Sequence, residues 1–257
     1  MLETEPDVSQ ARRKIVSFIK EKVELSQTDG VVFELEGSIN SAVTAYLSVE
    51  ALGTRRVTGL LMPDLRVADE RDIADAKAAG EELCLDVKQF DIAPIHRAFM
   101  KNLGENRSAE DNLRERIRMS LLYYHANTAN RLVMGTVSRA SLLLGNFTKY
   151  GDGGVDILPI ADLREREVRK LGEVLGIRRR IIAKKEPRSI RGWTSIIEAG
   201  VDSDTADRIF GAAGFGDSGI SGLVTRSGVS TTKVAVVVSR YEATSHKRRA
   251  SEICSVR

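Results

Sequence analysis

A short polar stretch near the N-terminal third of the chain holds residue types that could bind an anion. It reads Glu36-Gly37-Ser38-Ile39-Asn40-Ser41 and lies between an apolar run and a helical pattern. Backbone N–H groups at the start of a helix, beside a small residue such as Gly37, form a natural cradle for phosphate. A Gly/Ser turn also joins many strands to helices without binding anything, and Asn40 or Ser41 can simply cap the helix. On its own, the stretch predicts a connection that is compatible with a phosphate site.

A second stretch, Phe147-Thr148-Lys149-Tyr150-Gly151-Asp152-Gly153-Gly154, combines a lysine and an aspartate with clustered glycines that predict a loop. Histidines are few: His96, His125 and His246 are far apart and lack the spacing of a metal site. The sequence also has no Ser/His/Asp pattern that would indicate a nucleophile. The two polar loops are therefore the candidate sites for ligand binding or catalysis.

Composition places the chain among ordinary globular proteins. Its 257 residues are 42% hydrophobic and 29% charged, which predicts one domain over residues 1–257. Lys and Arg number 39 against 36 Asp and Glu, so no strongly basic face for nucleic acid is expected. Apolar runs such as Val234–Val238 are too short to span a membrane, and the acidic Met1–Ser9 does not read as a secretory signal. Cys84, expected in the core, and Cys254 suggest no disulfide or zinc site, so a cytoplasmic protein is expected.

Strand-like segments alternate with longer helical patterns, which predicts a three-layer α/β fold, a parallel sheet with helices on both faces. We expect strands at residues 31–35, 56–62, 86–92 and 132–135. We expect helices at residues 41–52, 69–84, 112–126 and 139–144, then only helices at 163–175, 205–212 and 232–241. Residues 211–230, rich in Gly and Ser, are predicted to be the most mobile segment. In such a sheet, ligands bind at the carboxyl ends of the strands, where the stretch at residues 36–41 lies.

From Ser41 to His246 the sequence resembles the ammonia-dependent NAD synthetases of the N-type ATP pyrophosphatase superfamily, which have an adenine nucleotide alpha hydrolase-like fold. The segments that carry the resemblance are Gly59–Pro63, Arg116–Met119 with Leu122-Tyr123 and Ala126-Asn127, Gly135-Thr136, Phe147–Gly154, Asp156, Pro159-Ile160, Asp162-Leu163 and Ser245–Arg248. The Phe147–Gly154 run is the most specific of them. The resemblance implies that ATP and Mg²⁺ adenylate deamido-NAD and that ammonia then displaces AMP.

The resemblance also implies a homodimer, with Asn112–Ala126 in its interface, and a set of binding residues. The residues it assigns to the nucleotide or dinucleotide are Arg116, Arg118, Thr136, Arg139, Lys149, Asp152, Asp156, Lys185, His246 and Lys247. Arg116 and Arg118 are two apart on a helix, so at most one of them is expected to point at a given ligand.

The sequence departs from the family where the pyrophosphate and Mg²⁺ would bind. The family loop reads Ser-Gly-Gly-x-Asp-Ser, so Glu36 adds a negative charge, Ser38 adds a side chain and Asn40 removes a carboxylate. Ser141 stands where the family carries an acidic Mg²⁺ ligand, and a neutral hydroxyl binds a hard cation poorly. Further on, Ser195-Ile196 replaces an Asp-Glu pair.

Two interpretations follow from these departures. In the first, the chain is an NAD synthetase in which other acids, such as Asp64 or Asp152, hold the metal. In the second, it is a non-catalytic nucleotide- or dinucleotide-binding homologue, or a regulatory partner of an active paralogue. The clustering of the departures predicts impaired or lost catalysis and weak binding of ATP-Mg²⁺.

Overall fold

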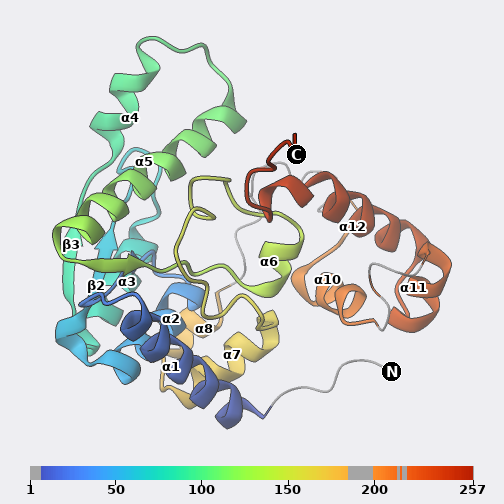
Figure 1. Cartoon of the computed structure of the whole chain (residues 1–257), viewed down its shortest axis with the longest axis horizontal. Helices are drawn as coiled ribbons and strands as arrows, with labels where there is room; N and C mark the ends of the chain where they lie inside the picture. The colour runs from blue at the N-terminus through green and yellow to red at the C-terminus, as the bar shows by residue number, and fades with distance from the viewer. Residues whose placement is uncertain (1–6, 185–198, 213–214, 216–218, 257) are drawn as a thin grey trace.

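The architecture is described from a computed structural model, which covers residues 7–184, 199–212, 215 and 219–256. Parallel strands in the order β3-β2-β1-β4 form the sheet (Figure 1). Their bounds are Gly30–Glu34 for β1, Val57–Leu61 for β2, Asp86–Gln89 for β3 and Arg131–Val133 for β4. In the register, Val31 of β1 lies opposite Val57 of β2 and Leu132 of β4. The carboxyl ends of all these strands therefore meet at one edge of the sheet.

Helices cover both faces of the sheet, as the alternating pattern predicted. On one face lie α1 (Val8–Leu25), α2 (Ile39–Leu52), α3 (Glu70–Glu82) and α7 (Glu165–Val174). The other face is covered by α5 (Arg107–Thr128), which packs Ile117, Met119 and Leu122 on the sheet. β1 serves both layers because its side chains alternate, so that Phe33 joins the first core and Val32 the second. The predicted three-layer α/β fold is confirmed.

A hairpin of α4 (Ala93–Met100) and the start of α5 projects from the sheet layer (Figure 1). We call residues 93–110 the projecting hairpin. It exposes large apolar side chains, Ile95, Phe99 and Leu103, which are 38%, 50% and 53% accessible. Ile95 and Phe99 lie one turn apart on α4, and Leu103 lies in the turn after this helix, so the projecting hairpin carries apolar side chains that the described part of the chain leaves exposed.

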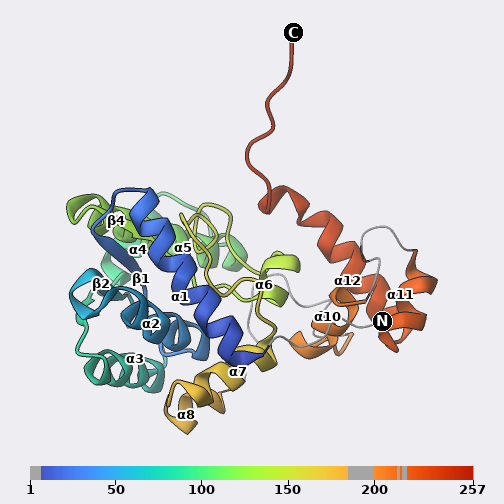
Figure 2. The same cartoon turned by 60° about the horizontal axis from the view of Figure 1, so that its bottom comes forward.

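The C-terminal part is helical and has its own core. α6 (Arg139–Leu143), α10 (Ser203–Phe210), α11 (Ile220–Ser227) and α12 (Thr231–Ala243) pack around Leu144, Phe210 and Val234. Short elements complete the chain, namely η1 (Thr54–Arg56), α8 (Arg179–Ile182) and η2 (Ser245–Lys247). Figure 2 shows this lobe beside the sheet layer, with the last residues extended away from both. No helix in the described ranges is long and apolar enough to cross a membrane.

Some expectations from the sequence were wrong. Cys84 is exposed rather than in the core, because α3 ends at Glu82 and Cys84 adopts a positive φ of 50° in the following turn. Within the stretch 211–230, residues 213–214 and 216–218 lie outside the described residues, and residues 220–227 form α11, a helix that was not predicted and that buries Leu223 in the C-terminal core. Helices α1 and α4 were not predicted at all, and β3 stops at Gln89 rather than at residue 92.

Candidate functional site

The loop at residues 36–41 joins β1 to α2 at the carboxyl edge of the sheet, as expected. Gly37 has a φ of 77°, and a Cβ atom there would lie 2.1 Å from the carbonyl oxygen of Asp72 in α3. Only glycine permits this close approach. Ser38 caps α2, since its hydroxyl accepts a hydrogen bond from the Ser41 backbone N–H at 3.2 Å. The backbone form of a phosphate-binding turn is therefore present.

The side chains of this loop are arranged for internal contacts. The Ser38 hydroxyl donates to Glu36 Oε1 at 3.0 Å, and the Glu36 backbone N–H donates to the Ser41 hydroxyl at 3.4 Å. The Glu36 carboxylate thus lies beside the N-terminus of α2, where the helix dipole favours negative charge. This carboxylate would repel an incoming phosphate, because it occupies the position at the helix N-terminus where a phosphate would bind.

Lys184, at the end of the chain's first described range, reaches the same loop. Its ammonium donates to the Gly37 carbonyl oxygen at 2.9 Å and pairs with Asp72 at 2.6 Å and Asp75 at 2.7 Å. Burial lowers the pKa of Lys184, but the hydrogen bonds that its ammonium donates to Asp72 and Asp75 outweigh this effect and raise that pKa overall. This cation therefore fastens the loop to α3. Lys185, the residue assigned to nucleotide binding, lies outside the described residues.

Arg118 lies at the carboxyl end of β1 and is held by acidic side chains. Its guanidinium pairs with Glu34 at 3.1 Å and with Glu115 at 2.6 Å, and it donates to the Met62 carbonyl oxygen at 3.0 Å. Burial raises the pKa of Glu34 well above its ordinary value, Arg118 lowers it, and the nearby charges of Glu115, Glu36 and Asp152 raise it further. Arg118 thus sits among the protein's own carboxylates, which compete with any phosphate for it.

Arg116 points elsewhere, as the two-residue spacing predicted. It is exposed and donates to the Lys149 carbonyl oxygen at 3.3 Å, so it contacts the second polar loop instead of β1. A further link runs from α5 to that loop, where the Thr148 hydroxyl donates to Asn112 at 2.7 Å. One helix therefore connects both loops through different faces.

The loop at residues 147–154 is fastened at both of its ends. Within it, the Thr148 backbone N–H donates to Asp152 at 2.6 Å. From the C-terminal segment, Lys247 donates to the carbonyl oxygens of Gly145 at 2.9 Å and Phe147 at 2.8 Å, and its ammonium lies 5.5 Å from the Phe147 ring centroid. The fold therefore brings together residues that are about a hundred positions apart in sequence.

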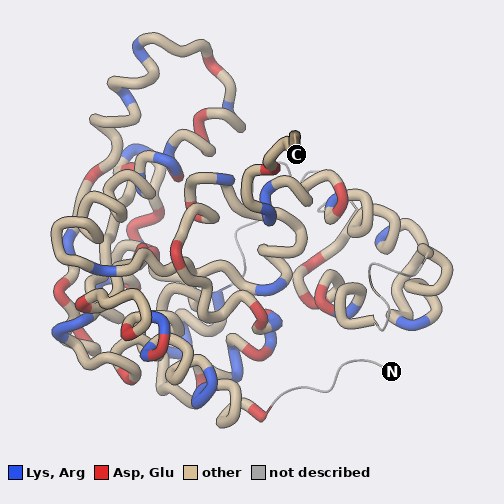
Figure 3. The backbone as a smooth tube through the Cα atoms, viewed as in Figure 1, with Lys and Arg blue, Asp and Glu red and all other residues tan. Residues whose placement is uncertain are grey.

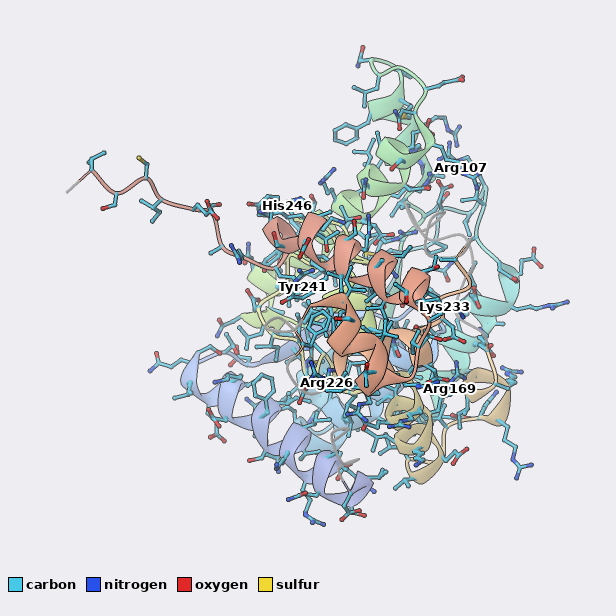
Figure 4. The ribbon with its side chains drawn as sticks, turned by 90° about the vertical axis from the view of Figure 1, so that its right-hand side faces the viewer. Arg107, Arg169, Arg226, Lys233, Tyr241 and His246 are labelled. Carbon is cyan, nitrogen blue, oxygen red and sulfur yellow. The ribbon has the colours of Figure 1, made fainter. Side chains whose placement is uncertain are left out.

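Two more of the predicted residues meet at this point. Lys149 donates to the His246 backbone oxygen at 2.7 Å, and the His246 ring faces the Ala243 carbonyl oxygen. Figure 4 shows His246 just beyond the C-terminal end of α12, whereas Lys233 lies near the other end of that helix. Lys149, Asp152, His246 and Lys247 thus form one neighbourhood.

The residues after β4 support the edge of the sheet. Asp156 accepts hydrogen bonds from the Tyr123 hydroxyl at 2.9 Å and from the Val133 backbone N–H at 2.7 Å. Thr136 follows the strand and is half-buried, and Arg139 opens α6 with its backbone N–H bonded to the Leu163 oxygen. Ser141 lies within α6, half-buried, and offers no carboxylate.

Neither Asp64 nor the loop provides a Mg²⁺ site. Asp64 is 1% exposed, with its carboxylate held by Arg66 at 2.6 and 2.8 Å and by Arg114 at 2.9 Å. The hydrogen bonds from Arg66 hold its pKa well below the ordinary range despite burial. Within the described residues, no group of three His, Cys, Asp or Glu is arranged to hold a metal ion. Among the described positions expected to hold Mg²⁺, Asn40 and Ser141 offer no carboxylate and do not fit the ion, while Ser195 and Ile196 lie outside the described residues.

A cavity of about 450 Å³ opens beside Arg118, between the projecting hairpin and Val67. Its wall alternates arginines with acids, because the charges of α5 pair at three-residue spacing, Asp111 with Arg114 and Glu115 with Arg118. The sequence analysis missed Glu34, Arg114 and Glu115. The regular spacing of opposite charges on α5 was a signal for the last two, whereas nothing local pointed to Glu34.

Comparison with known proteins agrees with this geometry. The model of the NAD synthase family matches residues 11–251. The chain belongs to the NAD synthase family. A protein of Archaeoglobus fulgidus named NH(3)-dependent NAD(+) synthetase is 42% identical over 246 residues, 95% of this chain and 96% of its own length. One of the same name from Pyrobaculum aerophilum is 46% identical over 209 residues, 79% of this chain and 77% of its own.

Solved structures of this NAD synthase family superpose over nearly the whole chain. The NH3-dependent NAD synthetase from Campylobacter jejuni, in complex with a nitrate ion, gives a TM-score of 0.82 at 30% identity, covering 98% of this chain and 100% of its own. The NMN synthetase from Francisella tularensis gives 0.83 at 25% identity, covering 97% and 99%. The chain therefore shares the fold of these solved structures over nearly its whole length.

Proposed function

We propose that this member of the NAD synthase family keeps a nucleotide-binding scaffold and has lost, or nearly lost, ATP- and Mg²⁺-dependent amidation of deamido-NAD. The observation that carries the proposal is the Glu36 carboxylate, which lies at the N-terminus of α2 and is held there by the Ser38 hydroxyl. Phosphate transfer and adenylation need donors and cations around the leaving pyrophosphate. This loop presents an acid instead.

The neighbouring charges support the same conclusion. Lys184 is bound to Gly37, Asp72 and Asp75, and Arg118 is bound to Glu34 and Glu115. At about 4 Å, one like charge costs a phosphate oxygen roughly 1 kcal/mol in water and several times more in a partly desolvated site. Together with Asn40 and Ser141 in place of acids, these contacts predict weak binding of ATP-Mg²⁺.

A second candidate function, binding of a dinucleotide without turnover, is favoured by the neighbourhood of Lys149, Asp152, His246 and Lys247. It places basic groups around a glycine-rich loop. On this proposal, deamido-NAD or NAD binds while ATP-Mg²⁺ does not. The relatives include proteins named for NAD and for NMN synthesis, so the mononucleotide belongs in the same test.

Calorimetric titration with ATP-Mg²⁺ and with deamido-NAD, run separately, tests the proposal. We expect heat from the dinucleotide and none from ATP-Mg²⁺ at millimolar concentration. The combined variant Glu36→Ser, Ser38→Gly, Asn40→Asp and Ser141→Glu restores the family residues and should regain ATP-Mg²⁺ binding. Tight binding of ATP-Mg²⁺ by the unmodified chain contradicts the proposal.

We also propose a homodimer that buries part of α5 and the projecting hairpin. Leu121, Leu122 and Tyr123 pack inside the chain, whereas Tyr124 is 66% exposed. Together with the apolar side chains of the projecting hairpin, Tyr124 leaves an apolar surface that a second copy would cover. Sedimentation at micromolar concentration should show a dimer, and a monomer there would overturn this part of the proposal.

A further inference from the structure

A cavity of about 280 Å³ lies away from both polar loops, between the start of α7 and α10. Its wall carries the arginines Arg164, Arg166 and Arg208 together with Asp204 and Asp207. α7 packs in the sheet core and α10 in the C-terminal core, so the cavity lies where the two cores meet. Neither the family resemblance nor the proposed function uses these residues.

Asp207 is the buried acid of this cavity, with 4% of its surface exposed. Its Oδ2 accepts a hydrogen bond from the backbone N–H of Glu165, the first residue of α7, at 3.1 Å. Its Oδ1 is buried and has no hydrogen-bond partner among the residues that the structure describes. An unpaired buried acceptor costs roughly 1–3 kcal/mol, so a donor placed there by a ligand would be favoured.

The charges that face Asp207 come from each element packed around it. Burial raises the pKa of Asp207 to about 7, the Glu165 N–H, Arg139 of α6 and Arg164 beside α7 lower it, and Asp204 of α10 raises it. At pH 8 the carboxylate is therefore ionised and can accept from a cationic N–H group.

The cavity wall suits a ligand that carries both signs of charge. A simple anion would meet Asp204 and Asp207, and a simple cation would meet three guanidinium groups. Guanidinium groups bind carboxylates through paired N–H donors. Arg208 donates one bond to the Ser227 carbonyl oxygen at 2.8 Å, and its five N–H donors leave others for a ligand.

We propose that this cavity binds a small zwitterion of the α-amino-acid class, its ammonium group donating to Asp207 Oδ1 and its carboxylate pairing with the arginines. A volume of about 280 Å³ lies just below the usual range of pockets for drug-like ligands, so the cavity suits a small ligand. Because the ligand contacts both α7 and α10, its binding joins the two cores.

Calorimetric titrations of the full chain at pH 8 with glycine, methylammonium and acetate test this proposal. We expect glycine to bind saturably at one site per chain, and the other two probes at least roughly tenfold more weakly. Asp207→Asn should weaken glycine binding roughly tenfold while keeping an acceptor for Glu165. Glu173→Gln, the same acid-to-amide change at an exposed position of α7, should leave binding unchanged.

Circular dichroism separates loss of binding from loss of folding. If Asp207→Asn does not fold, Arg166→Gln at the exposed rim replaces it as the test variant. It should weaken glycine binding, because it removes a guanidinium group that pairs with the glycine carboxylate. Equal affinity for acetate and glycine, or for methylammonium and glycine, would overturn the proposal. So would the absence of saturable glycine binding to the folded chain, or binding that neither variant changes. None of these titrations contains a nucleotide, so their outcome is separate from that of the proposed function.

Discussion

The loops at residues 36–41 and 147–154 differ in how closely they follow the pattern that the family resemblance predicts. The resemblance predicts other residue types at Glu36, Ser38 and Asn40 in the first loop, whereas the run Phe147–Gly154 of the second loop carries the resemblance. Yet both are tightly held: Ser38 and Lys184 secure the first, and Lys247 and Asp152 secure the second.

The difference shows that the form of a binding loop and its chemistry are supported by different atoms. Gly37 and the Ser38 hydroxyl maintain the turn of the first loop through close contacts with the backbone of Asp72 and Ser41, and neither contact uses the side chain at position 36. In the second loop, the side chains Lys247 and Asp152 themselves hold the backbone. Substitution there disturbs the fold, so the residues that provide the chemistry are also structural. Charges of both signs are interspersed over the rest of the chain (Figure 3), so the acid-rich setting of the first loop is local.

The largest effect should come from Gly37→Ala. The alanine would need a positive φ, and its Cβ would lie 2.1 Å from the Asp72 carbonyl oxygen, which belongs to a packed helix. We expect a loss of about 4 kcal/mol in the free energy of unfolding, measured with urea. Gly53→Ala is the control for backbone strain alone, because Gly53 has a similar φ of 75° with nothing within 4 Å, and it should cost about 2 kcal/mol. Equal losses would show that the first loop does not depend on its contact with α3.

Gly153→Ala tests whether the second loop also depends on a close contact at its glycine. Its Cβ would lie 2.1 Å from the Phe147 ring, a side chain that can shift in part. The expected loss is about 3 kcal/mol in the same urea experiment. Gly104→Ala, where nothing lies within 4 Å, is the control and should change stability by less than about 1 kcal/mol.

Lys247→Met tests whether a side chain holds the second loop. It removes two hydrogen bonds to the Gly145 and Phe147 carbonyl oxygens while keeping the apolar stem. We expect a loss of about 2 kcal/mol in the free energy of unfolding. Arg249→Met, two residues further on and largely exposed, should have almost no effect. A negligible loss in Lys247→Met would remove the proposed contrast between the loops.

The fold was largely predictable, because periodic apolar residues identify each strand and most helices. The missed helix α1 carries Ile15, Ile19 and Val23 at four-residue spacing, so its signal was present in the sequence. In α11 the glycines and serines weaken the apolar pattern that would predict a helix around Leu223. This helix packs against the C-terminal core through that residue.

The site was predictable only in part. The resemblance identified the two loops and the residues near His246. The grouping of Glu34, Arg118 and Glu115 depends on how β1 and α5 cross, which no local pattern contains. The same holds for Asp64, whose acidity suggested a metal ligand until its contacts with Arg66 and Arg114 were seen.

The smallest effect concerns Glu34, which lies just before the altered loop. Burial raises its pKa, so the folded state takes up a proton more readily than the unfolded one. Stability should therefore fall as the pH rises from about 4, where the unfolded glutamate titrates, through the raised folded pKa. Glu34→Gln should make that fall shallower, measured by urea unfolding across the pH range. The same slope of the unfolding free energy against pH in both proteins would show that Glu34 does not cause the fall.

We propose that the first loop keeps the backbone turn of a phosphate-binding loop and no longer supports ATP- and Mg²⁺-dependent amidation. A steady-state assay of NAD formation with saturating ammonia, ATP, Mg²⁺ and deamido-NAD tests it most directly. Three independent losses of about 1–2 kcal/mol each predict turnover roughly 10²–10⁴-fold below that of an active relative assayed in parallel. The variant Glu36→Ser, Ser38→Gly, Asn40→Asp and Ser141→Glu should recover part of that loss. Turnover by the unmodified chain near the enzyme median of about 10 s⁻¹ would contradict the account.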